Sequence, residues 1–264
     1  MSEKVTPGPV CGNPAIKEAV CVHTSKIIDS CRAKDCVEDL RLYLTIESQS
    51  IVENSVNVRP RSASLLYVST GVEDVPFNKG CYTVDIRYYY LVVGDAFSPA
   101  CKPAEITGLA VFNKRVVLYG GESTARVFSS KTPLCGDCAC EQSRVPTAVV
   151  EAVDPMVLGM KLVDICDCKY DPCAVTIPDC IAAMIPGDLN FGNSQRRVYV
   201  TLGQFSIAYL ERDTQLLIPA YDYCMPSKES EPAGEDDPCT LFSKIHFPVD
   251  DFFPADLPDK NPCR

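Results

Sequence analysis

The sequence has no tryptophan and only two histidines, His23 and His246. Histidine is the usual side chain for acid–base chemistry and metal binding near neutral pH, so this scarcity argues against the His-rich sites of many hydrolases and oxidases. Basic residues are also in deficit, with 25 Lys and Arg against 35 Asp and Glu and a formal net charge of −10. We therefore expect no nucleic-acid partner, because phosphate neutralisation needs a basic surface.

Long apolar runs are missing as well. No stretch of 18 apolar residues occurs, so we expect no membrane insertion, and residues 1–20 lack the apolar segment of a conventional secretory signal. Yet the chain carries 16 cysteines in 264 residues. Cysteine-rich chains usually belong to oxidising compartments, whereas a chain without a leader usually stays in a reducing cytosol. Metal binding, reduced thiols or a late exposure to oxidant would each resolve this conflict.

Motifs of catalysis and cofactor binding are absent too. The sequence has no G-x-S-x-G elbow, no phosphate-binding G-x-x-x-x-G-K-[ST] loop, no G-x-G-x-x-G fingerprint and no calcium-binding D-x-D-x-D-G loop. Surface or locally hydrogen-bonded positions are the simpler interpretation of both histidines. The sequence thus predicts no enzyme and no cofactor, although a carboxylate-based site with no recognisable motif stays open.

What the sequence does have is a period-two apolar pattern, which is typical of half-buried strands. It predicts a mainly β protein with an antiparallel β-sandwich-like core and few short helices. We expect Tyr88, Tyr89 and Tyr90 to form strand core plus an interface edge. We also expect a hairpin turn at Asn113-Lys114 and a bulge or strand bend at Gly203, where the apolar parity switches. Strands are expected at 40–46, 51–58, 64–69, 82–92, 106–112, 115–119, 125–128, 147–153, 156–163 and 198–210. Short helices are expected at 14–20 and 180–184, with a turn or two at 24–34.

Three stretches interrupt this pattern and divide the chain. We expect a Cys-rich N-terminal arm over residues 1–36, a β-rich core over 37–224 with a Cys-rich insert at about 133–180, and an acidic, Pro-rich C-terminal tail over 225–264. The C-terminal tail is separated from the β-rich core because its repeated prolines prevent regular strand ladders.

The cysteines lie mainly in these three stretches, outside the expected strands. Cys135 and Cys138 have C-x-x-C spacing, but no helix pattern follows them, which disfavours a thiol–disulfide exchange enzyme. A structural zinc held by Cys135, Cys138, Cys166 and Cys168 is the alternative that we keep, and a second conceivable set is Cys21, His23, Cys31 and Cys36. The leading interpretation is cross-linking, within or between chains, and its candidates are Cys11, Cys21, Cys31, Cys36, Cys135, Cys138, Cys140, Cys166, Cys168, Cys173, Cys180, Cys239 and Cys263.

The segment Val20–Thr45, VCVHTSKIIDSCRAKDCVEDLRLYLT, resembles the cysteine-rich spore-surface proteins of clostridia, the CsxA-like exosporium and coat proteins. The resemblance is strongest over residues 11–45. It implies a structural protein that is made in the mother-cell cytoplasm without a signal peptide and self-assembles on the spore surface into an ordered layer cross-linked by disulfides. Its partners would be further copies of itself and other spore-surface proteins. The alternative from a different class is a cytosolic binding module stabilised by the Cys-ligated zinc.

Overall fold

The computed structural model describes residues 8–9, 18–99, 102–122, 145–165, 177–192 and 194–220. Its fold is mainly β and antiparallel, as the sequence predicts. The chain divides into two compact units, one of residues 1–24 and 213–264, the other of residues 25–212. Strands β2 (Glu18–Leu44) and β8 (Arg196–Ala220) each contribute to both units.

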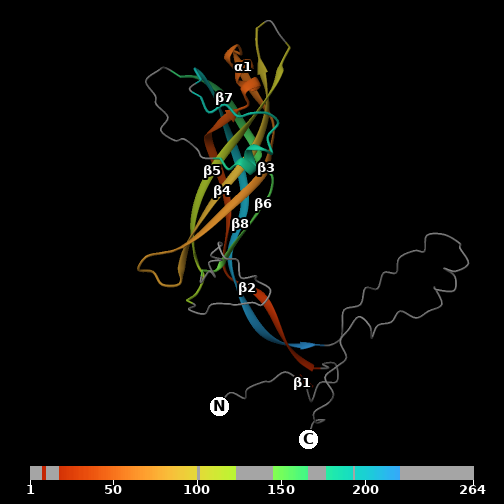
Figure 1. Ribbon diagram of the computed structural model, residues 1–264, viewed down its shortest axis with the longest axis vertical. Helices are drawn as coiled ribbons and strands as arrows, with labels where there is room; N and C mark the ends of the chain where they lie inside the picture. Colours follow the sequence, from red (N-terminus) through yellow and green to blue (C-terminus); the bar gives the residue numbers. More distant parts are fainter. Residues whose placement is uncertain are drawn as a thin grey trace, which may run out of the picture. The chain divides into compact units, whose positions relative to one another are not determined.

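One antiparallel sheet, nearly closed into a barrel, organises the described chain (Figure 1). Its strand order is β3-β4-β5-β2-β8-β6, with β1 pairing β2 and β7 pairing β8. The expected sandwich-like core is therefore the interior of one curved sheet. The remaining elements are β1 (Gly8–Pro9), α1 (Ile46–Glu53), β3 (Asn57–Asp74), β4 (Cys81–Phe97), β5 (Ala104–Tyr119), β6 (Thr147–Ala152), β7 (Met156–Asp164) and α2 (Asp179–Ala182).

The seam of this sheet lies between β3 and the β6–β7 connection. The side chain of Asp154, in that connection, accepts a hydrogen bond of 2.8 Å from the backbone N–H of Leu65 on β3. Leu65 stands at a register shift in the β3–β4 pairing, between Leu65 and Tyr67. Because β3 ends the strand order of the described sheet, one side of its backbone has no neighbouring strand, and the Asp154 carboxylate supplies an acceptor there.

Alternating burial explains why β4 and β5 are strands. Even-numbered residues of β4 point into the interior, where Tyr88, Tyr90 and Val92 have no exposed surface. Tyr89 points to the other face and packs with Tyr43, Leu109, Ile181 and Ile185 in a second cluster beside α2. The three consecutive tyrosines are strand core, as expected, but they serve two different apolar clusters.

The strand predicted at 51–58 is wrong over most of its length, because α1 occupies Ile46–Glu53 and β3 begins only at Asn57. Thr45 starts this helix: its hydroxyl accepts a hydrogen bond of 3.2 Å from the backbone N–H of Ser48. Such a cap satisfies one of the free N–H groups of the first turn and favours a helix over a strand.

Two further local predictions are wrong. Residues 24–34 form part of β2 rather than a helical turn, and the expected hairpin at Asn113-Lys114 is absent because β5 runs straight through it. Asn113 pairs with Arg87, and Lys114 pairs with Ile86, without a register shift. The short helix expected at 180–184 is present as α2, one residue earlier. Of the helix expected at 14–20, the described residues Glu18–Val20 belong to β2, and the strand expected at 125–128 lies outside the described residues.

The parity switch expected at Gly203 also proves wrong. Even residues of β8 remain buried on both sides of Gly203, from Leu202 to Gln204 and Ser206. The switch occurs on the neighbouring strand β2, where half-buried odd residues give way to buried even ones around Asp39. Asp39 has a φ of 55°. This left-handed conformation is typical of a β-bulge, and Asp is among the few non-glycine residues that adopt it readily.

Candidate functional site

Five of the cysteines fall in the described part of the chain, and none of these five forms a disulfide there. Cys21, Cys36 and Cys180 are exposed, whereas Cys31 and Cys81 are half-buried. Cys21, Cys31 and Cys36 lie within strand β2, so the expectation that the cysteines of the first 36 residues avoid strands is wrong for these three. Cys180 lies in the short helix α2.

The strand also separates two members of the conceivable metal set Cys21, His23, Cys31 and Cys36. Cys31 and Cys36 are five residues apart on β2, which is roughly 16 Å at about 3.3 Å per residue. Cys31 packs against the interior core, whereas Cys36 is exposed. Ligands of one tetrahedral zinc lie about 2–2.3 Å from the ion, so this set cannot form a single site. Among the described residues, no group of three or more His, Cys, Asp and Glu is placed to hold a metal ion.

The other candidate ligands and cross-linking cysteines lie outside the described residues, as does His246. They include the four cysteines of the zinc alternative, Cys135, Cys138, Cys166 and Cys168. The remaining cross-linking candidates in this position are Cys11, Cys140, Cys173, Cys239 and Cys263.

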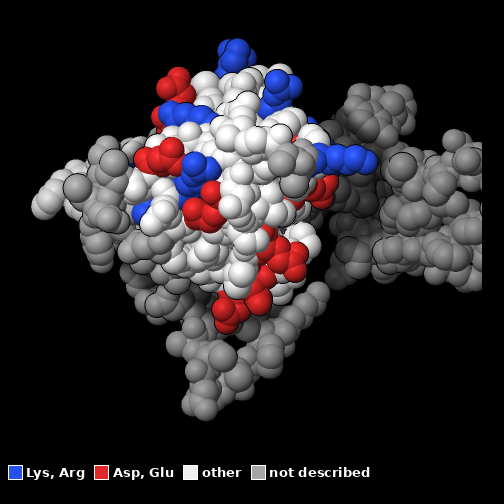
Figure 2. Space-filling view, turned by 90° about the horizontal axis from the view of Figure 1, so that it is seen from above, with Lys and Arg blue, Asp and Glu red and all other residues white. Residues whose placement is uncertain are grey.

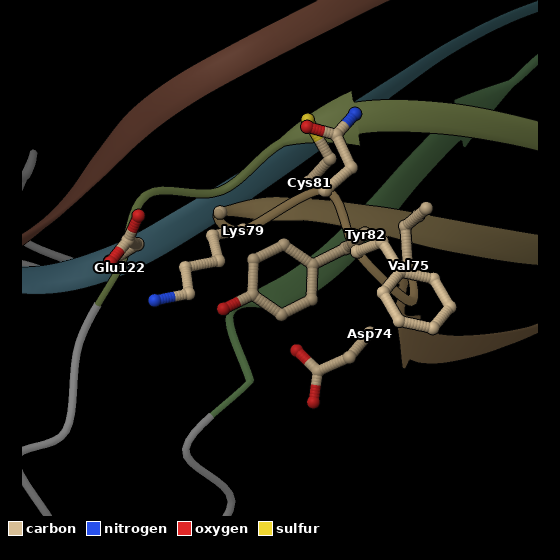
Figure 3. Close-up of a pocket in the computed structure, with 9 residues that line it drawn as sticks. Asp74, Val75, Lys79, Cys81, Tyr82 and Glu122 are labelled. Carbon is tan, nitrogen blue, oxygen red and sulfur yellow. The ribbon is translucent and has the colours of Figure 1, made fainter.

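A small open pocket of about 250 Å³ lies at the β3–β4 hairpin end (Figure 3). Asp74, Lys79 and Glu122 give it charged groups, and Cys81 with Tyr82 forms part of its wall. Arg212 anchors the adjoining end of β5: its Nε donates to the carbonyl of Gly120 over 2.6 Å, and one terminal nitrogen lies 2.9 Å from the Tyr82 hydroxyl. These contacts stabilise the hairpin end.

A polar group inside the sheet is the feature that the sequence reasoning missed. The Tyr88 hydroxyl donates a hydrogen bond of 2.9 Å to Oγ of Ser206, and Lys114 Nζ lies 2.5 Å from a carboxylate oxygen of Asp35. Both side chains of the ion pair are mostly covered, at 16% and 24% exposed. The sequence contains a signal for the buried lysine. Lys114 occupies an even position between Phe112 and Val116, which face the interior from β5.

The two interior tyrosines have shifted pKa values. Burial raises the pKa of Tyr90, and the neighbouring Tyr88 and Asp35 raise it further. Burial likewise raises the pKa of Tyr88, against the opposing effect of its hydrogen bond with Ser206. The Tyr90 hydroxyl is buried and has no hydrogen-bond partner among the described residues. Both phenols stay neutral at physiological pH, which suits a structural core.

Charged groups on the outer surface form cross-strand pairs. Arg115 Nε lies 2.6 Å from Asp85, its direct register partner on β4, and this hydrogen bond lowers the pKa of the Asp85 carboxyl. In the end-on view, basic and acidic side chains are interspersed with uncharged ones (Figure 2). Such pairs contribute little to stability, since exposed ion pairs are screened by solvent.

Comparisons with known proteins add no assignment. A scan against protein-family models, a search of curated proteins and a search of solved structures each returned no match. Within the described residues, neither helix is long and apolar enough to cross a membrane.

Proposed function

We propose that this protein is a structural protein that assembles with copies of itself and is then cross-linked by disulfides into an ordered spore-surface layer. The observation that carries the proposal is the set of unpaired, exposed cysteines on regular elements, Cys36 on β2 and Cys180 on α2. A strand or helix holds a thiol in a fixed direction at the surface. Such a thiol is well placed to react with another chain.

The fold is consistent with this role. The interior is filled by large side chains such as Tyr88, Tyr90 and Ile86, so the sheet has an apolar core that can hold it together without disulfides. The cysteines then remain available for contacts between chains. The resemblance of residues 11–45 to clostridial spore-surface proteins supplies the location, because proteins made in the mother cell meet an oxidising exterior only after it lyses.

Gel electrophoresis with and without reductant tests the proposal. Purified full-length protein, oxidised in air, should migrate as a ladder of covalent oligomers that collapses to a monomer on reduction. Cys36→Ser and Cys180→Ser should each weaken the ladder. Cys31→Ser is the matched control, because Cys31 lies on the same strand as Cys36 but packs against the core. A monomer under both conditions would contradict the proposal.

A further inference from the structure

An apolar patch covers the outer face of the sheet where β8 meets the β6–β7 connection. Five large side chains there are 42–58% exposed: Val153, Met156, Leu158, Phe205 and Ile207. They surround Gly203, where a Cβ would lie 3.5 Å from Leu158 and 3.8 Å from Met156. We call these residues the Gly203 patch.

The pairing registers make the patch continuous. Met156 pairs with Gly203, and the backbone N–H of Val153 donates to the carbonyl of Phe205. The buried Gln204 side chain holds β8 to the β6–β7 connection. Its Nε2 donates to the carbonyl oxygens of Val153 at 2.9 Å and Phe205 at 2.7 Å. The patch is thus held on a rigid backbone and is preformed for contact.

Opposite charges flank the patch. On the β2 side, Arg32 and Lys34 are exposed, and the Lys34 ammonium lies 5.8 Å from the centre of the Phe205 ring. On the β6 side, Glu151 is exposed and pairs directly with Ile207, and the exposed Asp154 follows. The patch therefore has one basic edge and one acidic edge.

We propose that the Gly203 patch is the interface between two copies of this chain, related by a two-fold axis parallel to β8. That axis places the basic edge of each copy on the acidic edge of the other, whereas an axis across the strands would place like charges together. The proposal deepens the proposed function and rests on it for the identity of the partner.

The exposed apolar area of the Gly203 patch is large enough for contact with a second copy of the chain. Five half-exposed large side chains amount to on the order of 500 Å², which is at the upper end of patches on monomeric proteins. Together with the charged edges, the contact approaches the roughly 800 Å² per partner of a standard interface. Cys36 is exposed two residues beyond Lys34 on β2, so the dimer places a reactive thiol at the rim of the contact.

Sedimentation equilibrium of the full-length protein in reductant tests the interface separately from disulfide formation. The wild type should dimerise. Phe205→Glu should raise the dissociation constant of the dimer roughly tenfold or more, because it places a charge in the apolar centre of the patch. Met156→Glu is a second variant should Phe205→Glu fail to fold. Val117→Glu is the matched control, since Val117 is 57% exposed on the outer face of β5, outside the patch.

Charge reversal tests the two-fold arrangement. Lys34→Glu and Glu151→Lys should each weaken the dimer, and the double variant should restore it. A wild type that stays monomeric in reductant, a control as weak as Phe205→Glu, or a double variant without rescue would each overturn the interface. A reductant-stable dimer that forms no disulfide ladder would instead contradict the cross-linking function and leave the interface standing.

Discussion

The hydroxyl of Tyr88 on β4 donates a 2.9 Å hydrogen bond to Oγ of Ser206 on β8, so two strands that are not neighbours in the sheet are joined through its interior. The Tyr88 ring also stacks on Tyr90, with ring centroids 6.1 Å apart and planes within 2°. Tyr90 has the same ring and burial, but its hydroxyl has no partner among the described residues. The two tyrosines therefore form a natural pair for substitution.

Replacement of each tyrosine by phenylalanine should have opposite effects. Tyr88→Phe removes a buried hydrogen bond and leaves Ser206 without it, at a cost of about 1 kcal/mol in the free energy of unfolding. Tyr90→Phe removes a buried hydroxyl that has no partner in the described part of the chain, so stability should stay equal or rise by up to about 1 kcal/mol. Urea unfolding in reductant measures both, and an equal loss in the two variants would contradict the assignment.

The raised pKa values of the same tyrosines predict a loss of stability in alkali. An unfolded tyrosine ionises near pH 10, whereas burial keeps Tyr88 and Tyr90 neutral in the folded protein. Their contribution is present in full below about pH 10 and is lost as the pH rises toward the folded pKa values. Urea midpoints at pH 8 and about 10.5 should differ less in Tyr90→Phe than in the wild type. An identical difference would argue against a shifted Tyr90.

The interior ion pair makes a third prediction. Lys114→Met leaves the Asp35 carboxylate without its cation beside Tyr88 and Tyr90, and should destabilise the protein by about 2 kcal/mol. Lys114→Met combined with Asp35→Leu removes both charges and should recover most of that loss. Unfolding of the two single variants and the double variant measures the coupling. Additive losses would show that the pair is not formed.

The left-handed backbone at Asp39 gives a fourth prediction. Its φ of 55° suits Asp, Asn or Gly, so Asp39→Asn should have little effect. Asp39→Val places a β-branched side chain in the left-handed region and should cost about 1–2 kcal/mol. Both variants also lose the exposed ion pair between Asp39 and Lys161, which contributes little to the free energy of unfolding. Asp39→Asn therefore measures that loss by itself. Thermal unfolding of both variants is the measurement, and equal melting temperatures would contradict a left-handed conformation at residue 39.

The sequence predicts the fold class well because alternation is a local property. The even residues of 82–92 are apolar throughout, and they lie within β4 with the expected face inside, although Tyr89 on the other face is buried as well. The failures have identifiable causes. Ile51 and Val52 look like strand residues, but the cap at Thr45 and the contacts of Ser48 make a helix. Asn113-Lys114 resembles a two-residue turn between two apolar segments. The contact between Lys114 and Asp35 of another strand, which the sequence cannot show, places Lys114 inside the sheet instead.

The candidate site was less accessible to sequence reasoning. The cysteine excess is plain in the composition, but the placement of Cys31 inside and Cys36 outside depends on the parity of β2 before Asp39. The Gly203 patch was hidden for a related reason. The apolar pattern predicts that Phe205 and Ile207 face the interior after a parity switch, whereas buried Gln204 and Ser206 keep the even residues inside. The polar contacts of those two residues explain how the interior face accommodates them.

Electron microscopy of the purified, full-length protein before and after air oxidation tests the central claim most directly. Self-assembly followed by disulfide cross-linking predicts ordered rings, tubes or sheets that survive dilution once oxidised and dissociate in reductant. Separate single particles of monomer size under both conditions would contradict a structural, layer-forming role.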